Sequence, residues 1–149
     1  MPDRRDDKTV DEEKESNDMK NNKTINRIAI KTGTADGDLL KALLLEETKL
    51  KQIPVEPGMA VYRKDDGTII EFYGAGAFHP DYLFKYTNVV FGFRVRDLKK
   101  TSVMMQKHGA KLLGSIETVC NAFIYCHLLL NNTTVVGLYE YLMPPKKTY

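Results

Sequence analysis

The residues best suited to metal binding or nucleophilic chemistry gather in one short segment, CNAFIYCH, at residues 120–127. The segment lacks the paired Cys-x-x-Cys spacing of a structural zinc site. On a strand, Cys126 and His127 point to opposite faces, so they form neither a shared metal site nor a cysteine nucleophile with its histidine base. We therefore expect ordinary buried cysteines at Cys120 and Cys126.

The other two histidines give no stronger signal. His79 falls in a loop-like segment, FHPD, where it could overhang a cleft, but a lone loop histidine is usually only solvated. His108 comes at the end of a predicted helix, where its charge suits the helix dipole. The nearby GAGAF is too short to cradle a phosphate, and no Gly-Lys-Ser/Thr follows it.

A glycine interrupts the last strand-like segment, TTVVGLYEYL, which is otherwise rich in β-branched and aromatic residues. Glycine weakens a strand interior, and it often marks a bulge or the close approach of a backbone or a ligand. Two interpretations of Gly137 therefore stay open. The glycine marks a bulge or tight packing site, or it leaves space for a ligand.

The body of the chain divides into two halves with a similar order of elements. In the first half, an alternating segment, TINRIAIKT, predicts a strand, residues 39–53 predict a helix, and MAVYRKDDGTIIEFYG predicts a hairpin that turns at Asp66-Gly67. The second half predicts a strand in NVVFGFRVRDL, a helix at 98–108, a short strand in AKLLGSI and a hairpin made by NAFIYCHLLL and TTVVGLYEYL. The first half lacks an obvious short strand after its helix.

The expected domain boundaries follow from this order. Residues 1–24 are mostly polar and charged, and such a segment cannot bury enough apolar surface to offset its ordering entropy. We expect a disordered tail there and a loose basic tail at 143–149. One domain is expected at 25–142, with module one at 25–75, a linker at 76–87 and module two at 88–142.

The composition excludes several classes of protein. A net charge of +2 is too small to argue for a nucleic-acid or membrane-surface partner. The chain has no run of about 18 apolar residues that would predict a spanning helix, no signal-peptide core, and two cysteines are too few for a disulfide framework. We therefore expect a cytoplasmic protein.

Several of these segments are similar to a known superfamily. VVFGFRVRDLKKTSVMMQKHGAKLLGSI, followed by FIYCHLLLNNTTVVGLYEYL, resembles a module of the vicinal oxygen chelate superfamily, also called the glyoxalase/bleomycin-resistance/dioxygenase group, and DDGTIIEFYG fits the last strand of such a module. The resemblance implies an α+β fold, in which two βαβββ-type modules form curled mixed sheets around a cleft, with the helices outside. Members of the group often dimerise, so a homodimer is left open.

In the metalloenzymes of this superfamily, four cleft-facing side chains on the first and last strands of each module bind a divalent ion. Carried over, these positions fall on Arg27, Glu71, Val90 and Gly137. Valine and glycine offer no donor atom, and a guanidinium stays protonated. A tightly held ion needs about three protein ligands. The resemblance thus argues against a metal, and no cofactor is expected. It also implies that Arg27 and Glu71 converge into an ion pair, which could be bidentate.

Strand alternation then gives the cleft lining. It comprises Arg27, Ala29, Lys31, Ile69, Glu71 and Tyr73 from module one, and Val90, Gly92, Arg94, Val135, Gly137 and Tyr139 from module two. Because tyrosines stack on planar groups and arginines grip anions, the predicted ligand-binding residues are Arg27, Glu71, Tyr73, Arg94, Gly137 and Tyr139. Alternatively, Lys31 and Arg94 reach solvent at the rim. This register leaves Phe91 and Phe93 on the helix-facing side with Val136 and Leu138.

Three functional hypotheses remain. The first is a metal-free protein that binds a planar or anionic small molecule, similar to the antibiotic-sequestering members of the superfamily. The second is a metal-dependent lyase, isomerase or dioxygenase with a different ligand set, and an enzyme here would be lactoylglutathione-lyase-like or dioxygenase-like. The third is a regulatory or scaffold protein with a degenerate cleft. Metal-free catalysis, with Glu71 or a tyrosine transferring a proton, also stays open.

Overall fold

The computed structural model describes residues 24–47 and 49–142. The expected tails at 1–24, apart from Thr24, and at 143–149 lie outside the described residues. None of the helices in the described part of the chain is long and apolar enough to cross a membrane. The elements are, in chain order, β1 (Ile25–Lys31), α2 (Ala35–Leu44), β2 (Lys51–Ile53), β3 (Met59–Arg63), β4 (Ile69–Tyr73), β5 (Val89–Arg94), α3 (Leu98–Lys107), β6 (Lys111–Val119), β7 (Phe123–Leu130) and β8 (Thr134–Tyr141).

The strands form one mixed sheet in the order β2-β3-β4-β1-β5-β8-β7-β6. The two first strands, β1 and β5, lie side by side at its middle and pair antiparallel. Outward from β1 the order is β4, β3, β2, and outward from β5 it is β8, β7, β6, so both modules have the same topology. In both modules the first and last strands pair parallel. The predicted pair of βαβββ modules is confirmed.

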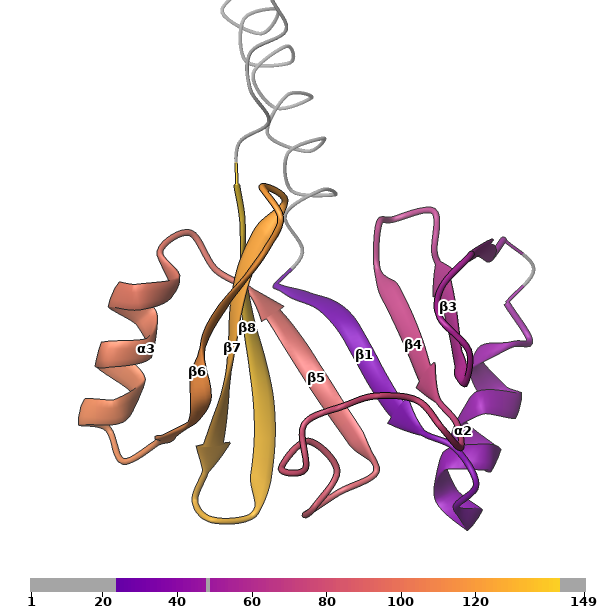
Figure 1. The fold of residues 1–149 in the computed structure, drawn as a ribbon, viewed down its shortest axis with the longest axis horizontal. Helices are drawn as coiled ribbons and strands as arrows, with labels where there is room; N and C mark the ends of the chain where they lie inside the picture. The colour runs from indigo at the N-terminus through magenta and orange to yellow at the C-terminus, as the bar shows by residue number, and fades with distance from the viewer. Residues whose placement is uncertain (1–23, 48, 143–149) are drawn as a thin grey trace, which may run out of the picture.

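The sheet curls, and each helix covers the outer face of its own module (Figure 1). Helix α2 packs through Leu40 and Leu44 on a buried cluster of Ile30, Ile70 and Phe72. Helix α3 belongs to a second cluster, in which Leu98 packs with Cys126, Leu128, Val136 and Leu138. Burying these apolar faces leaves the opposite, concave face of the sheet free to form a site.

The first predicted helix is wrong in its extent. Helix α2 begins at Ala35, where the Thr34 side chain caps it by accepting from the Gly37 N–H, and it ends at Leu44. Residues 51–53, predicted as helix, form β2 and pair antiparallel with β3. Their helix propensity is overridden because pairing with β3 supplies hydrogen bonds and seats Ile53 against Val61. The strand that module one seemed to lack is therefore present.

Module two follows the predicted order closely. Helix α3 begins after Asp97, whose side chain accepts from the Lys100 N–H, and it ends at Lys107. The predicted hairpin is β7 and β8, and the predicted short strand is the longer β6. The predicted register is confirmed, because Phe91 pairs with Val136 and Phe93 with Leu138.

The segment between β4 and β5 folds back over the concave face. Within it, Leu83 and Phe84 are buried in a cluster with Ala29, Val90 and Val135, which face them from the sheet. The predicted linker is therefore part of the core. It fills one end of the concave surface and leaves a cavity beside it.

Candidate ligand-binding site

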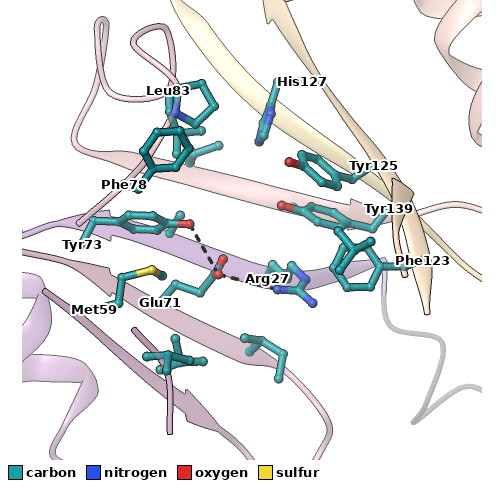
Figure 2. A pocket seen from close by; sticks show the side chains of 18 of the residues that line it. Arg27, Met59, Glu71, Tyr73, Phe78, Leu83, Phe123, Tyr125, His127 and Tyr139 are labelled. Atoms are coloured by element: carbon teal, nitrogen blue, oxygen red, sulfur yellow. Dashed lines mark hydrogen bonds and ion pairs between the residues drawn. The ribbon is translucent and has the colours of Figure 1, made fainter. Parts of the chain in front are cut away.

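A cavity of about 610 Å³ lies on the concave face, between the two halves of the sheet. Strands of both modules and the segment between β4 and β5 contribute its lining. The side chains labelled in Figure 2 converge on it from these elements. A cavity of this size is within the range of small-molecule sites.

The two sides of the cavity differ in chemistry. Module one supplies mainly aliphatic groups, which are Ile53, Val55, Met59, Val61 and Ile69. Module two supplies mainly aromatic groups, which are Phe123, Tyr125, His127 and Tyr139. The Tyr125 and Tyr139 rings stack, with centroids 5.7 Å apart and an interplanar angle of 19°. A flat ligand would therefore find an apolar wall on one side and aromatic groups on the other.

An ion pair joins two neighbouring strands of module one at the cavity. Arg27 of β1 and Glu71 of β4 approach to 3.7 Å between Nη1 and Oε2, and their side chains are only 15% and 14% exposed. The predicted pair is confirmed, but as a single long contact and not as the bidentate arrangement. The Tyr73 hydroxyl donates to the same Glu71 oxygen at 3.5 Å (Figure 2).

Aromatic rings hold the guanidinium in place. The Arg27 Cζ atom lies 4.8 Å from the Phe123 ring centroid and 4.9 Å from that of Tyr139, so both rings make cation–π contacts. The Arg27 Nε has no hydrogen-bond partner among the described residues, although it is buried. The guanidinium is therefore fixed but incompletely hydrogen-bonded.

Burial and pairing act against each other on the two charges. Burial raises the pKa of Glu71 above its usual range, and the attraction of Arg27 and the Tyr73 hydrogen bond reduce this shift without cancelling it. For Arg27, burial lowers the pKa, but Glu71 and the neighbouring tyrosines outweigh burial and raise it overall. Arg27 thus stays charged, whereas Glu71 takes up a proton more readily than an exposed glutamate.

Two glycines explain where Tyr139 lies. Gly92 of β5 pairs with Gly137 of β8, and a Cβ atom built on either would approach the Tyr139 ring to 2.6 Å or 2.8 Å. The ring therefore occupies the space that both missing side chains leave. Of the two interpretations of Gly137, the structure supports tight packing. The Tyr139 ring, and not a ligand, fills the space beside Gly137.

Tyrosine hydroxyls are the other polar groups here. The hydroxyls of Tyr73, Tyr125 and Tyr139 point into the cavity (Figure 2). Burial raises the pKa of all three tyrosines, and the charge of Glu71 raises them further. Within the described residues, no hydrogen bond ties down the hydroxyl of Tyr125 or Tyr139. These O–H groups are therefore protonated donors open to a ligand.

His127 lies above the stacked tyrosines (Figure 2). Its side chain is buried, with only 5% exposed, and its Nδ1 lies 3.2 Å from the Tyr82 hydroxyl. Burial lowers the pKa of His127 to about 4, so the ring is neutral near pH 7. It adds a neutral hydrogen-bonding group to the cavity.

Comparison with known proteins identifies the fold but not a close relative. No protein-family model matches the sequence, and no curated protein matches it. Among solved structures, a hypothetical protein from Bacillus halodurans has a TM-score of 0.56 at 13% identity, over 83% of this chain and 97% of that one. A glyoxalase/bleomycin resistance protein/dioxygenase superfamily member from Vibrio splendidus has a TM-score of 0.51 at 8% identity, over 76% and 95%.

The Mn(II)-bound glyoxalase of Novosphingobium aromaticivorans has a TM-score of 0.52 at 9% identity, over 83% of this chain and 42% of that chain. These likenesses, together with the duplicated βαβββ topology, decide the fold. The chain has the vicinal oxygen chelate fold. At such low identity the likeness concerns architecture alone.

The registers also test whether a metal of the kind this fold holds in metalloenzymes would fit. Glu71 pairs with Ala29 in module one, and Gly137 pairs with Gly92 in module two. The equivalent position of the last strand is therefore a carboxylate in module one and a glycine in module two. The matching first-strand positions are Arg27 and Val90. One carboxylate, a cation and two side chains without donors do not make a metal site. Among the described residues, no three His, Cys, Asp or Glu side chains gather to hold an ion.

The structure brings together four of the six predicted ligand-binding residues. Arg27, Glu71, Tyr73 and Tyr139 line the cavity, whereas Gly137 lies beneath the Tyr139 ring. Arg94 packs its guanidinium over the Tyr141 ring, with Cζ 4.8 Å from the centroid, and is not part of the lining. Of the wider predicted set, Val135 is covered by the segment between β4 and β5, and Lys31 does not line the cavity.

Sequence reasoning missed the contribution of β7. Phe123, Tyr125 and His127 alternate with Ile124 and Cys126, which pack on the α3 side. The expectation that Cys126 and His127 face opposite ways was right, and extending it along the strand would have found all three lining residues. The expectation of two buried cysteines is wrong for Cys120, which is exposed in the turn between β6 and β7. No sequence signal placed Phe78, which lines the cavity although 81% exposed.

Proposed function

We propose that this protein is a metal-free small-molecule-binding protein whose cavity takes a planar ligand. The single observation that carries the proposal is the cavity of about 610 Å³ with an aromatic side, an aliphatic side and an incompletely hydrogen-bonded Arg27. A flat ring would pack between the two sides, and its polar group would meet Arg27 and the tyrosine hydroxyls.

Each alternative explains these features less well. A metal-dependent lyase, isomerase or dioxygenase with a different ligand set needs about three donor side chains close together, and the described residues gather no three His, Cys, Asp or Glu side chains. A scaffold protein with a degenerate cleft has no use for a cavity in which the buried Arg27 Nε lacks a partner among the described residues, because such a group is costly to bury without a ligand. Binding is therefore the better account of the same residues.

The test is a thermal-shift screen of planar compounds that differ in charge and ring number. A ligand that binds only the folded protein raises the melting temperature with its concentration, because at a hundredfold excess over Kd it adds about 2.7 kcal/mol to the free energy of unfolding. The shift should disappear in Tyr139→Ala, which removes half of the tyrosine stack, and persist in Tyr86→Ala, which removes a tyrosine outside the cavity lining. Equal shifts in both variants, or no shift for any compound, would refute the proposal.

A further inference from the structure

The ion pair in the cavity favours one charge type of ligand. Arg27 keeps its proton at any ordinary pH, because a guanidinium does not titrate in proteins. Glu71, in contrast, can neutralise itself by taking up a proton. A cationic ligand would be repelled by the buried positive charge of Arg27, which cannot be neutralised. An anionic ligand would be repelled by the Glu71 carboxylate, which can be neutralised by protonation.

The geometry of the pair also leaves Arg27 available. Its contact with Glu71 is 3.7 Å long, which exceeds the 2.7–2.9 Å or so of a charge-assisted hydrogen bond. Its Nε has no partner among the described residues. The rings of Phe123 and Tyr139 hold the guanidinium without using its N–H donors, although the Tyr141 hydroxyl accepts from one of them. A ligand carboxylate could therefore make a better pair with Arg27 than Glu71 does.

Among the groups that face Glu71, Arg27 is the charged one. Glu71 is faced by Arg27 of β1, Tyr73 of β4, Tyr125 of β7 and Tyr139 of β8. On β3, its neighbour is the uncharged Val61. Of the other titratable groups in the lining, His127 is neutral near pH 7, and Glu56 adds a second negative charge. An anion entering here is therefore repelled less when Glu71 carries a proton.

We infer that the cavity binds a planar organic monocarboxylate together with one proton, the carboxylate pairing with Arg27 and the proton residing on Glu71. The inference rests on the proposed function and adds the ligand class and the linkage to pH. The protonated Glu71 then becomes a donor, and the hydroxyls of Tyr73 and Tyr139 complete a set of groups that suits an oxygen-rich anion. The raised pKa of Glu71 is consistent with this uptake.

The test is isothermal titration calorimetry of the full chain with three probes of matched shape, 2-naphthoate, 2-naphthamide and 2-naphthylmethylamine. Titrations at pH 7 in two buffers of different ionisation enthalpy give the number of protons taken up. We expect 2-naphthoate to bind most tightly and to take up close to one proton. Its affinity should fall by up to about tenfold per pH unit between pH 6 and 8.

Two variants test the two parts of the inference separately, namely the uptake of a proton by Glu71 and the pairing of the carboxylate with Arg27. Glu71→Gln, which mimics the protonated acid, should bind 2-naphthoate with no proton uptake and no pH dependence, and more tightly than the native chain at pH 8. Its matched control, Glu46→Gln, removes an exposed carboxylate outside the lining and should keep the uptake. Arg27→Met should lose the preference for 2-naphthoate over 2-naphthamide while still binding the amide.

The outcomes distinguish this inference from the proposed function. Binding of 2-naphthoate without proton uptake, or tighter binding of the amine, overturns the inference and leaves a small-molecule cavity. Equal affinity for acid and amide does the same. If no probe binds and no planar compound raises the melting temperature, both the inference and the proposed function are wrong.

Discussion

At the scale of single residues, the cavity is shaped by an ion pair and by two glycines. Arg27 supplies a positive charge that Glu71 partly balances. Gly137 makes room for the ring of Tyr139. Each of these residues depends on its neighbours, because an unpaired charge or an unfilled space would be costly in a largely buried site.

A double-mutant cycle measures the coupling of the ion pair. Arg27→Met or Glu71→Gln alone strands a partly buried charge, so each should lower the free energy of unfolding by about 1–3 kcal/mol. The double variant should lose less than the sum of the two. Chemical denaturation of all four proteins gives the coupling, and purely additive losses would mean that the pair contributes nothing.

A second residue-scale prediction concerns the space above Gly137. Gly137→Ala puts a methyl group 2.8 Å from the Tyr139 ring and should lower the free energy of unfolding by about 1–3 kcal/mol through overpacking. In a Tyr139→Ala background the same change should cost little. Once the tyrosine ring and its hydroxyl are removed, the nearest atom to the new methyl group belongs to His127, at an ordinary contact distance of 3.5 Å. An equal cost in both backgrounds would show that the ring is not what forbids the side chain.

At the scale of elements, β7 decides the character of the cavity. Its alternation sends Phe123, Tyr125 and His127 to the concave side and Cys126 to the α3 side. In module one the matching strand, β3, offers Met59 and Val61 instead. The two modules thus share a backbone plan while their third strands line the cavity with different chemistry.

The burial of His127 on β7 predicts a pH dependence of stability. Its pKa is lowered to about 4 in the folded chain, against about 6.5 when unfolded, so folding excludes a proton. The contribution is complete above pH 6.5 and is lost as the pH falls through 4, amounting to on the order of 3 kcal/mol.

Denaturation series between pH 7 and pH 4 compare the native chain with His127→Gln, which should show a smaller acid loss. His108→Gln, at the exposed end of α3, keeps His127 and should lose stability as the native chain does. An unchanged acid loss in His127→Gln would contradict the assignment.

At the scale of the whole molecule, a duplicated module forms a site at its pseudo-two-fold axis. The antiparallel β1–β5 pair joins the modules, so residues from both reach the same cavity. Duplication places related positions opposite each other, and their divergence gives one aliphatic and one aromatic side. The result is an asymmetric cavity from a nearly symmetric fold.

The metal prediction belongs to this scale, because an ion would bridge both modules. The purified chain should hold no stoichiometric divalent ion by elemental analysis, and a chelator should leave its melting temperature unchanged, since Arg27, Val90 and Gly137 supply no ligand. One tightly held zinc, nickel, iron or manganese ion per chain would contradict this prediction.

The sequence by itself determined the two modules and the faces of their strands, whereas the Arg27–Glu71 pair was implied by the resemblance to a known superfamily. Alternation along a strand is a local property, so it can be followed without knowing what the strand packs against. The same reasoning assigned Tyr73 and Tyr139 to the concave face, where both line the cavity. It failed at residues 51–53, where local helix propensity favoured the wrong structure.

Only the tertiary structure decided how the space on the concave face is filled. The ring of Tyr139 covers the two glycines, and Leu83 and Phe84 cover Val135, although these groups are far apart in the sequence. Such contacts depend on volume and on the path of a loop, which no periodicity records. The sequence gives the direction of each side chain, whereas close packing of distant segments determines which of them a ligand can reach.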